Sequence, residues 1–272
     1  MSEILKVACL QFSASPDVAE NLRVLEKMIR EAAGKGARLI ATPENSCHIR
    51  GKSSDKLSSA YPEESHPFIK AMSGLAKELD IYILLGSISI LLGDRLANRS
   101  LLFAPSGKII SSYDKIHLFD VDLGKGESYR ESDYFKGGDR LALADIDAAK
   151  LGLTICYDIR FSYLYRALAK AGAEIIAIPA AFTVPTGEAH WEVLLRARAI
   201  ETGSFIIAPA QTGEHEGGRK TWGHSMIINP WGKILAEAGK DQEIIYADLD
   251  LAEIEKARNS IPALRHDKEF SF

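Results

Sequence analysis

Residues 36–43 read Gly-Ala-Arg-Leu-Ile-Ala-Thr-Pro, and residues 172–179 read Gly-Ala-Glu-Ile-Ile-Ala-Ile-Pro. Five of the eight positions are identical. In both segments a glycine precedes a short apolar run, which is typical of a helix that ends and leads into a buried strand. We interpret the repetition as two halves of related architecture within one domain. The alternative is that Gly-Ala is simply a common way to leave a helix, with no relation between the halves.

The residues before the first segment predict a β-α-β unit. Residues 7–12 (VACLQF) are apolar on both alternating faces, as in a strand buried on both sides. Ser15 is a suitable N-cap, with Pro16 at the first helical position. An apolar stripe at helical spacing follows and ends at the glycines that open the repeat: Val18, Leu22, Leu25, Ile29 and Ala32. Such a unit favours two parallel strands joined by a right-handed crossover.

The rest of the chain repeats this alternation of strands and helices. Helices are expected at 161–171 and 188–202, and residues 116–139 form a long polar loop of the kind that is usually functional or disordered. Strands are expected at 81–90, 98–104, 108–113, 151–155, 174–178, 205–209, 224–229, 233–236 and 244–248. The pattern predicts a mixed α/β sandwich with helices outside packed sheets. One domain spans residues 1–272, with a core at about 4–250 and a tail at 251–272.

Composition excludes several classes of protein. The 272 residues carry 33 basic and 37 acidic side chains, a net charge of −4 without a basic run, so nucleic acid is a poor candidate partner. No apolar stretch is long enough to cross a bilayer, and no signal peptide precedes the first strand. The three cysteines, Cys9, Cys47 and Cys156, include no Cys-x-x-Cys pair. We therefore expect a cytoplasmic protein without disulfides, bound metal or cofactor.

Cys156 has the sequence context of a nucleophile. It directly follows an apolar strand and precedes Tyr157, where a helix can begin. A helix start lowers the pKa of a thiol, and the backbone N–H of Tyr157 could bind an oxyanion. The alternative is a buried structural cysteine, which is how we interpret Cys9 in mid-strand, while Cys47 stays ambiguous.

Glu44 and Lys115 also follow predicted strands. Glu44 comes after Pro43, and we expect partial burial to raise its pKa toward neutrality, as suits a general base. Lys115 follows the strand at 108–113 and could stabilise an oxyanion by its charge. Taken singly, each could be an ordinary surface residue.

Together these motifs resemble the nitrilase superfamily of carbon–nitrogen hydrolases over nearly the whole chain. The matching blocks are ATPENS with Glu44, YDKIHLFD with Lys115 and GLTICYDIRF with Cys156, supported by HWEVLLRARAIET and GHSMIINPWGKIL. The resemblance implies a four-layer α-β-β-α sandwich. It also implies that Cys156 is the nucleophile, Glu44 the base and Lys115 the oxyanion stabiliser. A second family glutamate falls at Glu131, where it would orient Lys115 or the leaving amine.

The resemblance also implies a substrate class. True nitrilases usually have Cys-Trp-Glu at the nucleophile, whereas here Tyr157 and Asp158 follow the cysteine, as in the Nit-type omega-amidases and deaminated-glutathione amidases. Those enzymes act on small 2-oxo or dicarboxylic monoamides. Arg160 would pair with a substrate carboxylate, and Phe182 and Thr186 would line the same pocket. The alternative for Arg160 is a structural ion pair with Asp158 or a neighbouring subunit.

Three further readings stay open at this point. The same scaffold could carry a nitrilase or an N-carbamoyl hydrolase, or it could be an inactive binding protein. The resemblance also implies a homodimer or a larger homo-oligomer. The intact set of base, cation and thiol favours an active amidase that needs no cofactor.

Overall fold

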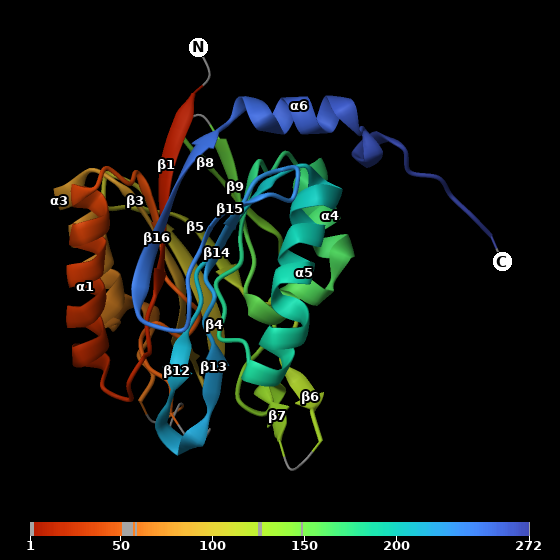
Figure 1. The fold of residues 1–272 in the computed structure, drawn as a ribbon. Coiled ribbons are helices and arrows are strands. Elements are labelled where there is room, and N and C mark those ends of the chain that lie inside the picture. The colour runs from red at the N-terminus through yellow and green to blue at the C-terminus, as the bar shows by residue number, and fades with distance from the viewer. Residues whose placement is uncertain (1–2, 51–56, 58, 125–126, 148, 272) are drawn as a thin grey trace.

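The computed structural model describes residues 3–50, 57, 59–124, 127–147 and 149–271. Two six-stranded sheets pack face to face, and helices cover the outer face of each (Figure 1). One sheet runs in the order β16 (Glu243–Asp250), β1 (Ile4–Gln11), β2 (Leu39–Ala41), β3 (Tyr82–Leu92), β4 (Arg95–Phe103), β5 (Ile109–Asp114). The other runs β15 (Ile234–Glu237), β14 (Met226–Ile228), β11 (Phe205–Ala208), β10 (Ile175–Ala177), β9 (Ala149–Leu153), β8 (Ala142–Ile146).

Helices complete the four layers. The first sheet is covered by α1 (Val18–Gly34) and α3 (Pro67–Leu79), and the second by α4 (Ser162–Lys170) and α5 (Val184–Thr202) (Figure 1). A last helix, α6 (Ala252–Ser260), lies across one end of the sandwich. The α-β-β-α sandwich expected from the sequence is confirmed.

The two sheets have the same internal plan. Strands β1, β2 and β3 are parallel neighbours, as are β9, β10 and β11. Each parallel trio is followed by an antiparallel strand, β4 or β14, and is flanked on its other edge by an antiparallel strand, β16 or β8. The repeated segments supply the equivalent strands β2 and β10. The interpretation as two related halves is therefore confirmed at the level of topology.

The two repeated segments converge on one glycine of β3. A Cβ atom on Gly86 would lie 1.7 Å from the carbonyl oxygen of Thr42 and 2.7 Å from Cβ of Pro179. The backbone N–H of Gly86 donates to Oγ1 of Thr42 at 2.9 Å. Only a residue without a side chain fits between the two strand ends.

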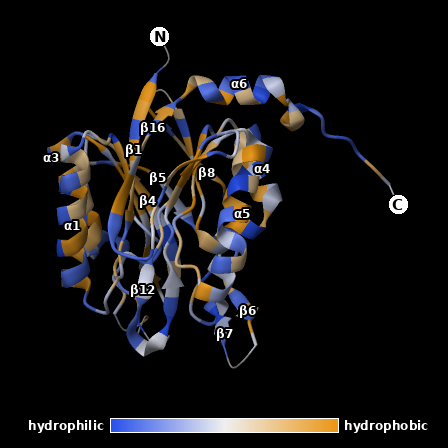
Figure 2. Ribbon diagram, in the orientation of Figure 1, coloured by the Kyte–Doolittle hydropathy of each residue, from blue (hydrophilic) through white to orange (hydrophobic). Residues whose placement is uncertain are grey.

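Hydrophobic residues form two clusters: one fills the space between the sheets and continues beneath α4 and α5, and the other lies beneath α1 and α3 (Figure 2). Alternate residues of β1 serve both: Val7 and Cys9 pack between the sheets, and Ala8 and Leu10 pack against the helices. This two-sided burial explains the continuous apolar pattern of the strand. Within the described ranges, no helix combines the length and apolarity that a membrane span requires.

The N-cap of α1 differs from our expectation. Asp17, not Ser15, caps the helix: its carboxylate accepts hydrogen bonds from the backbone N–H groups of Ala19 at 2.8 Å and Glu20 at 3.1 Å. Ser15 instead accepts a hydrogen bond from the N–H of Asp17 at 3.1 Å. A carboxylate at the N-cap also interacts favourably with the helix dipole.

Several elements were not predicted from the sequence. Helix α3 and strand β8 were missed, and so was the hairpin of β12 (Thr212–Glu214) and β13 (Lys220–Trp222). The segment 116–139, predicted as a loop, contains the hairpin of β6 (Asp120–Asp122) and β7 (Ser128–Arg130) and a 3₁₀ helix at Glu131–Asp133. Helix α5 starts at Val184, four residues earlier than expected, with Pro185 in its first turn. These hairpins are too short to show a strand period.

Candidate active site

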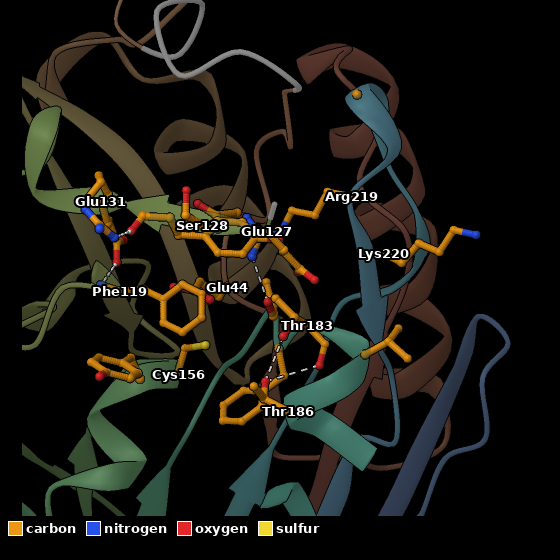
Figure 3. Close-up of a pocket in the computed structure, with 18 of the residues that line it drawn as sticks. Glu44, Phe119, Glu127, Ser128, Glu131, Cys156, Thr183, Thr186, Arg219 and Lys220 are labelled. Carbon is orange, nitrogen blue, oxygen red and sulfur yellow. Dashed lines mark hydrogen bonds between the residues drawn. The ribbon is translucent and has the colours of Figure 1, made fainter. Parts of the chain in front are cut away.

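The three residues singled out as catalytic meet at one cavity of about 710 Å³ (Figure 3). Glu44 follows β2, Lys115 follows β5 and Cys156 follows β9. All three side chains are buried, with 2%, 2% and 7% exposure. Two strand ends of the first half and one of the second therefore position the three catalytic side chains.

A buried polar network surrounds Lys115. Its Nζ donates to Oε1 of Glu44 and to Oε2 of Glu131, both at 2.9 Å. The backbone N–H of Phe119 also donates to Oε2 of Glu131, at 2.7 Å. Glu131 thus orients the lysine from the 3₁₀ helix within the segment predicted as a loop.

Asn98 belongs to this network and was missed by the sequence analysis. Its Nδ2 donates to Oε1 of Glu44 and to Oε1 of Glu131, both at 3.0 Å. Asn98 is 1% exposed and lies in the middle of the apolar strand β4. The available signal was a polar side chain in a strand that is otherwise buried, because such a group needs partners inside the protein.

The charged groups of this network shift one another's pKa values toward the ionised forms. Burial alone disfavours the ammonium of Lys115, but Glu131 and Glu44 raise its pKa well above the ordinary value. Burial would likewise raise the pKa of Glu44, but Lys115 lowers it below the ordinary value. Our expectation of a raised pKa for Glu44 was therefore wrong, because it did not include the ion pair.

Cys156 has a strained backbone, with φ of 48° in the left-handed region that side chains disfavour. Its N–H donates to the carbonyl oxygen of Pro179 at 2.9 Å, which fixes the turn. Burial and the Glu44 carboxylate raise the pKa of the Cys156 thiol well above its ordinary value, although Lys115 opposes them. The resting sulfur is therefore a neutral thiol beside a carboxylate.

This arrangement determines how a thiolate can form. Glu44, Glu131 and Lys115 together carry one net negative charge, so loss of the thiol proton to solvent would add a second. Transfer of that proton to Glu44 leaves the net charge unchanged. The site thus favours thiolate formation by direct proton transfer to Glu44.

Hydrogen bonds hold the Glu44 turn in place. The N–H of Asn45 donates to Oγ of Ser87 at 3.0 Å, and Oγ of Ser46 donates to the carbonyl oxygen of Pro43 at 2.7 Å. From the second half, Nε2 of Gln211 donates to the backbone carbonyl oxygen of Glu44 at 3.0 Å. The base therefore has support from both halves.

Asp158 joins the segments that carry Lys115 and Cys156. Its fully buried carboxylate accepts from the hydroxyl of Tyr113 at 2.7 Å and from the backbone N–H groups of Ile155 at 2.9 Å and His117 at 3.0 Å. Asp158 lies in the 3₁₀ helix Cys156–Arg160, where we expected a helix to begin. Tyr157 is the second residue of this helix, where a backbone N–H has no acceptor within the helix.

The structure places some of the predicted substrate-binding residues at the cavity and one of them outside its lining. Tyr157, Phe182 and Thr186 line the cavity, but Arg160 is not among the lining residues. The guanidinium of Arg160 donates to Nδ1 of His190 at 3.2 Å and lies 5.6 Å from the centre of the Phe182 ring. It forms no ion pair with Asp158, whose carboxylate contacts the His117 ring instead, with Nδ1 at 2.7 Å from Oδ1.

The remaining cysteines and polar segments bear less on the site. Cys9 is fully buried in β1, as predicted, and burial raises the pKa of its thiol. Cys47 is also buried. Of the polar segment 48–60, residues 51–56 and 58 lie outside the described residues. Across the described ranges, no three His, Cys, Asp or Glu side chains gather as metal ligands would.

Comparison with known proteins agrees with this geometry. A family model described as carbon-nitrogen hydrolase matches residues 6–259. The chain is 38% identical to the deaminated glutathione amidase of Yersinia enterocolitica, covering 96% of this chain and 92% of that protein. It is 34% identical to the human omega-amidase NIT2, covering 97% and 95%. The crystal structure of Saccharomyces cerevisiae Nit3, a member of branch 10 of the nitrilase superfamily, superposes with a TM-score of 0.87 at 32% identity, over 98% and 97% of the two chains.

Proposed function

The chain belongs to the carbon–nitrogen hydrolase family as an amide-hydrolysing enzyme of the nitrilase superfamily, and from this premise we propose that it cleaves a small carboxylate-bearing monoamide through a thioester on Cys156. The observation that carries the proposal is that Cys156, Glu44 and Lys115 are buried around one cavity, where Nζ of Lys115 donates to Oε1 of Glu44 at 2.9 Å. Relatives named deaminated glutathione amidase and omega-amidase support a 2-oxo or dicarboxylic acid monoamide as the substrate.

Acylation begins with proton transfer from Cys156 to Glu44 as the sulfur attacks the amide carbonyl carbon. The ammonium of Lys115 and the backbone N–H of Tyr157 stabilise the oxyanion. The C–N bond then breaks, and the proton held by Glu44 passes to the leaving nitrogen, which departs as ammonia or an amine.

Water completes the cycle. Glu44, now a carboxylate again, takes a proton from water as the oxygen attacks the thioester carbonyl. The C–S bond breaks, the acid product leaves and Cys156 recovers its proton. Glu131 takes no proton in this scheme; it keeps Lys115 charged and in place.

Membership of this family also supports proposals on the substrate-binding residues, the cellular compartment and the assembly of the enzyme. Tyr157, Phe182 and Thr186, which line the cavity, are proposed to contact the substrate, whereas Arg160 lies outside that lining. A reducing cytoplasmic compartment suits a catalytic thiol, and we propose that the enzyme acts as a homodimer or larger homo-oligomer without a cofactor.

The test is a substrate panel combined with two cysteine variants. The panel contains dicarboxylic monoamides, 2-oxo acid amides, deaminated glutathione, a neutral amide, a nitrile and an N-carbamoyl compound, with ammonia or amine release as the readout. We expect Cys156→Ser to reduce kcat/KM by at least roughly 10³-fold. Cys9→Ala, at another buried cysteine, serves as the matched control. Mass spectrometry of quenched wild-type enzyme should show an acyl group on Cys156.

Two results would count against the proposal. One is near-normal turnover by Cys156→Ser, which would exclude the thioester route. The other is release of product only from the nitrile or the N-carbamoyl compound, which would favour the other chemistries that this scaffold could carry.

A further inference from the structure

A carboxylate-bearing substrate faces an electrostatic obstacle at this site. Glu44 and Glu131 outnumber the single ammonium of Lys115, so the catalytic end of the cavity is negative. An anionic substrate would be repelled unless a cation elsewhere in the cavity binds its charge. Besides Lys115, the basic residues that line the cavity are Arg50, Arg130, Arg219 and Lys220.

Two of these four cations are exposed and already have partners. Arg130 is exposed and donates to the backbone carbonyl oxygens of Val121 and Tyr129. Lys220 is exposed and pairs with Glu214 at 3.3 Å. Arg50 adjoins residues outside the described ranges. Arg219 is the remaining candidate.

Arg219 has no anionic partner among the described residues. It lies between the two strands of the β12–β13 hairpin and is half-buried, and its guanidinium sits 5.5 Å from the centre of the Tyr129 ring. Its Nη2 donates to the carbonyl oxygen of Ala181 at 2.8 Å, while its buried Nε has no hydrogen-bond partner. A half-buried guanidinium without a counter-ion is unfavourable until an anion binds.

The hydrogen bond from Arg219 to Ala181 places the guanidinium near the sulfur of Cys156. Ala181 accepts the hydrogen bond of Arg219 through its carbonyl, and its own N–H lies close enough to the Cys156 thiol to lower the pKa of that thiol. One residue therefore separates the guanidinium from the nucleophile. Figure 3 shows Arg219 extending from its hairpin toward the cavity that Cys156 and Glu44 share. The side chains of Arg219 and Cys156 both line this cavity, so one bound molecule could contact both.

We propose that Arg219 binds the substrate carboxylate at the far end of the acyl chain from the scissile amide. The proposal rests on the proposed amidase function and assigns to Arg219 a task for which Arg160 was the candidate by resemblance. The planar guanidinium can bind a carboxylate through two parallel hydrogen bonds, which a lysine cannot reproduce.

The kinetic test compares two amides of equal chain length, succinamate and neutral butyramide. For wild-type enzyme we expect a preference for succinamate in kcat/KM. Arg219→Gln should lower the succinamate-to-butyramide ratio by at least about 30-fold, and Arg219→Lys should lower it less. Arg140→Gln removes the same charge from an exposed arginine that does not line the cavity, and it should leave the ratio within about threefold of wild type.

A binding measurement tests the role of Arg219 even if its variants hydrolyse the amides too slowly for kinetics. Cys156→Ala protein is titrated with succinamate by calorimetry, alone and combined with Arg219→Gln or Arg160→Gln. We expect the Arg219→Gln combination to weaken binding by at least about 30-fold, with circular dichroism showing that each variant is folded. Loss of binding should follow Arg219 rather than Arg160.

The outcomes separate the two proposals. Equal loss on both amides, an unchanged ratio, or loss of binding that follows Arg160 alone would overturn the role of Arg219. A wild-type enzyme that prefers butyramide would overturn it as well, yet leave the amidase function standing. A wild-type enzyme that hydrolyses no amide of the panel would refute the proposed function, and the calorimetric comparison would still decide whether Arg219 binds a carboxylate.

Discussion

Asn98 uses one amide nitrogen to hold two carboxylates that would otherwise repel each other. Its donors reach Glu44 and Glu131 from the middle of β4, and it does not line the cavity. Its effect on catalysis should therefore pass through the charge state and position of Glu44. A donor to a carboxylate lowers the pKa of that carboxylate, so its loss must raise the pKa of Glu44.

Asn98→Leu should consequently shift the acid limb of the pH profile of kcat/KM to higher pH and lower kcat by about 10²-fold, as loss of a preorganised hydrogen bond does. KM should change much less. Steady-state kinetics across the pH range measures all three effects, with Asn259→Leu at the exposed end of α6 as the control. An acid limb that stays at the wild-type pH would contradict this role.

His215 couples stability to pH. It is buried in the loop that joins β12 and β13, where its ring bonds to the carbonyl oxygen of Ala14 at 3.0 Å and to Oγ1 of Thr221 at 2.7 Å. Burial is the main cause that lowers the pKa of His215 from 6.5 to about 4. Between these values the unfolded chain binds a proton that the folded protein does not, so stability is lost as the pH falls.

This residue should contribute a loss of about 2 kcal/mol in the free energy of unfolding between pH 7 and pH 5. Urea unfolding at the two pH values should therefore show a smaller pH dependence for His215→Gln than for wild type. His266→Gln, at an exposed position near the C-terminus, should retain the full dependence. The same pH dependence in wild type and His215→Gln would disprove the assignment.

At the scale of elements, glycines with opposite surroundings offer a paired test. Gly86 in β3 is wedged between Thr42 and Pro179, whereas a Cβ on Gly74 in α3 would meet no atom within 4 Å. Gly86→Ala should destabilise the protein by several kcal/mol, because the clash is with backbone. Gly74→Ala should stabilise it by about 0.5–1 kcal/mol, since alanine favours a helix interior. Thermal and urea unfolding measure both; a tolerated Gly86→Ala would show that the strand ends can move apart.

The elements that could be predicted are those with a clear period or a marked end. The buried strands β1, β2 and β10 had continuous apolar runs closed by glycine and proline, and α1 had a regular stripe. Helix α3 was also open to prediction, since its buried residues Phe68, Met72, Leu75 and Ala76 recur at helical spacing. The three-residue strands of the β6–β7 and β12–β13 hairpins had no such pattern, because their pairing depends on the surrounding structure.

The same distinction holds for the site. Positions directly after strands pointed to Glu44, Lys115 and Cys156. Their relation to each other required a family resemblance, since no local pattern states which strand ends are neighbours. Asn98 left a signal, a polar residue within a buried strand, but its partners Glu44 and Glu131 follow only from the fold. The half-burial of Arg219 and its lack of an ion pair cannot be read from the sequence either.

At the scale of the whole molecule, the halves are joined by buried polar contacts as well as by apolar packing. The hydroxyl of Tyr113 at the end of β5 donates to Asp158 beside Cys156, at 2.7 Å. Burial and Asp158 raise the pKa of Tyr113 well above its usual range, so the hydroxyl stays a donor. This bond connects the first sheet with the catalytic turn of the second.

Tyr113→Phe should therefore lower the free energy of unfolding by about 1–3 kcal/mol, because a buried carboxylate loses a donor. Tyr61→Phe is the matched control: that ring is 39% exposed, and we expect a change below about 0.5 kcal/mol. Urea unfolding provides the comparison. Equal effects of the two changes would mean that the bond adds nothing to the joining of the halves.

The pairing of β1 with β16 has a consequence for biosynthesis. Eight residue pairs, from Ile4 with Asp250 to Gln11 with Glu243, join the first strand of the chain to the last. A ribosome releases β1 early, yet the neighbour that completes its hydrogen bonds emerges only with residues 243–250. While the residues between β1 and β16 are translated, the nascent chain therefore presents an unpaired strand edge, the feature through which incomplete proteins associate with one another.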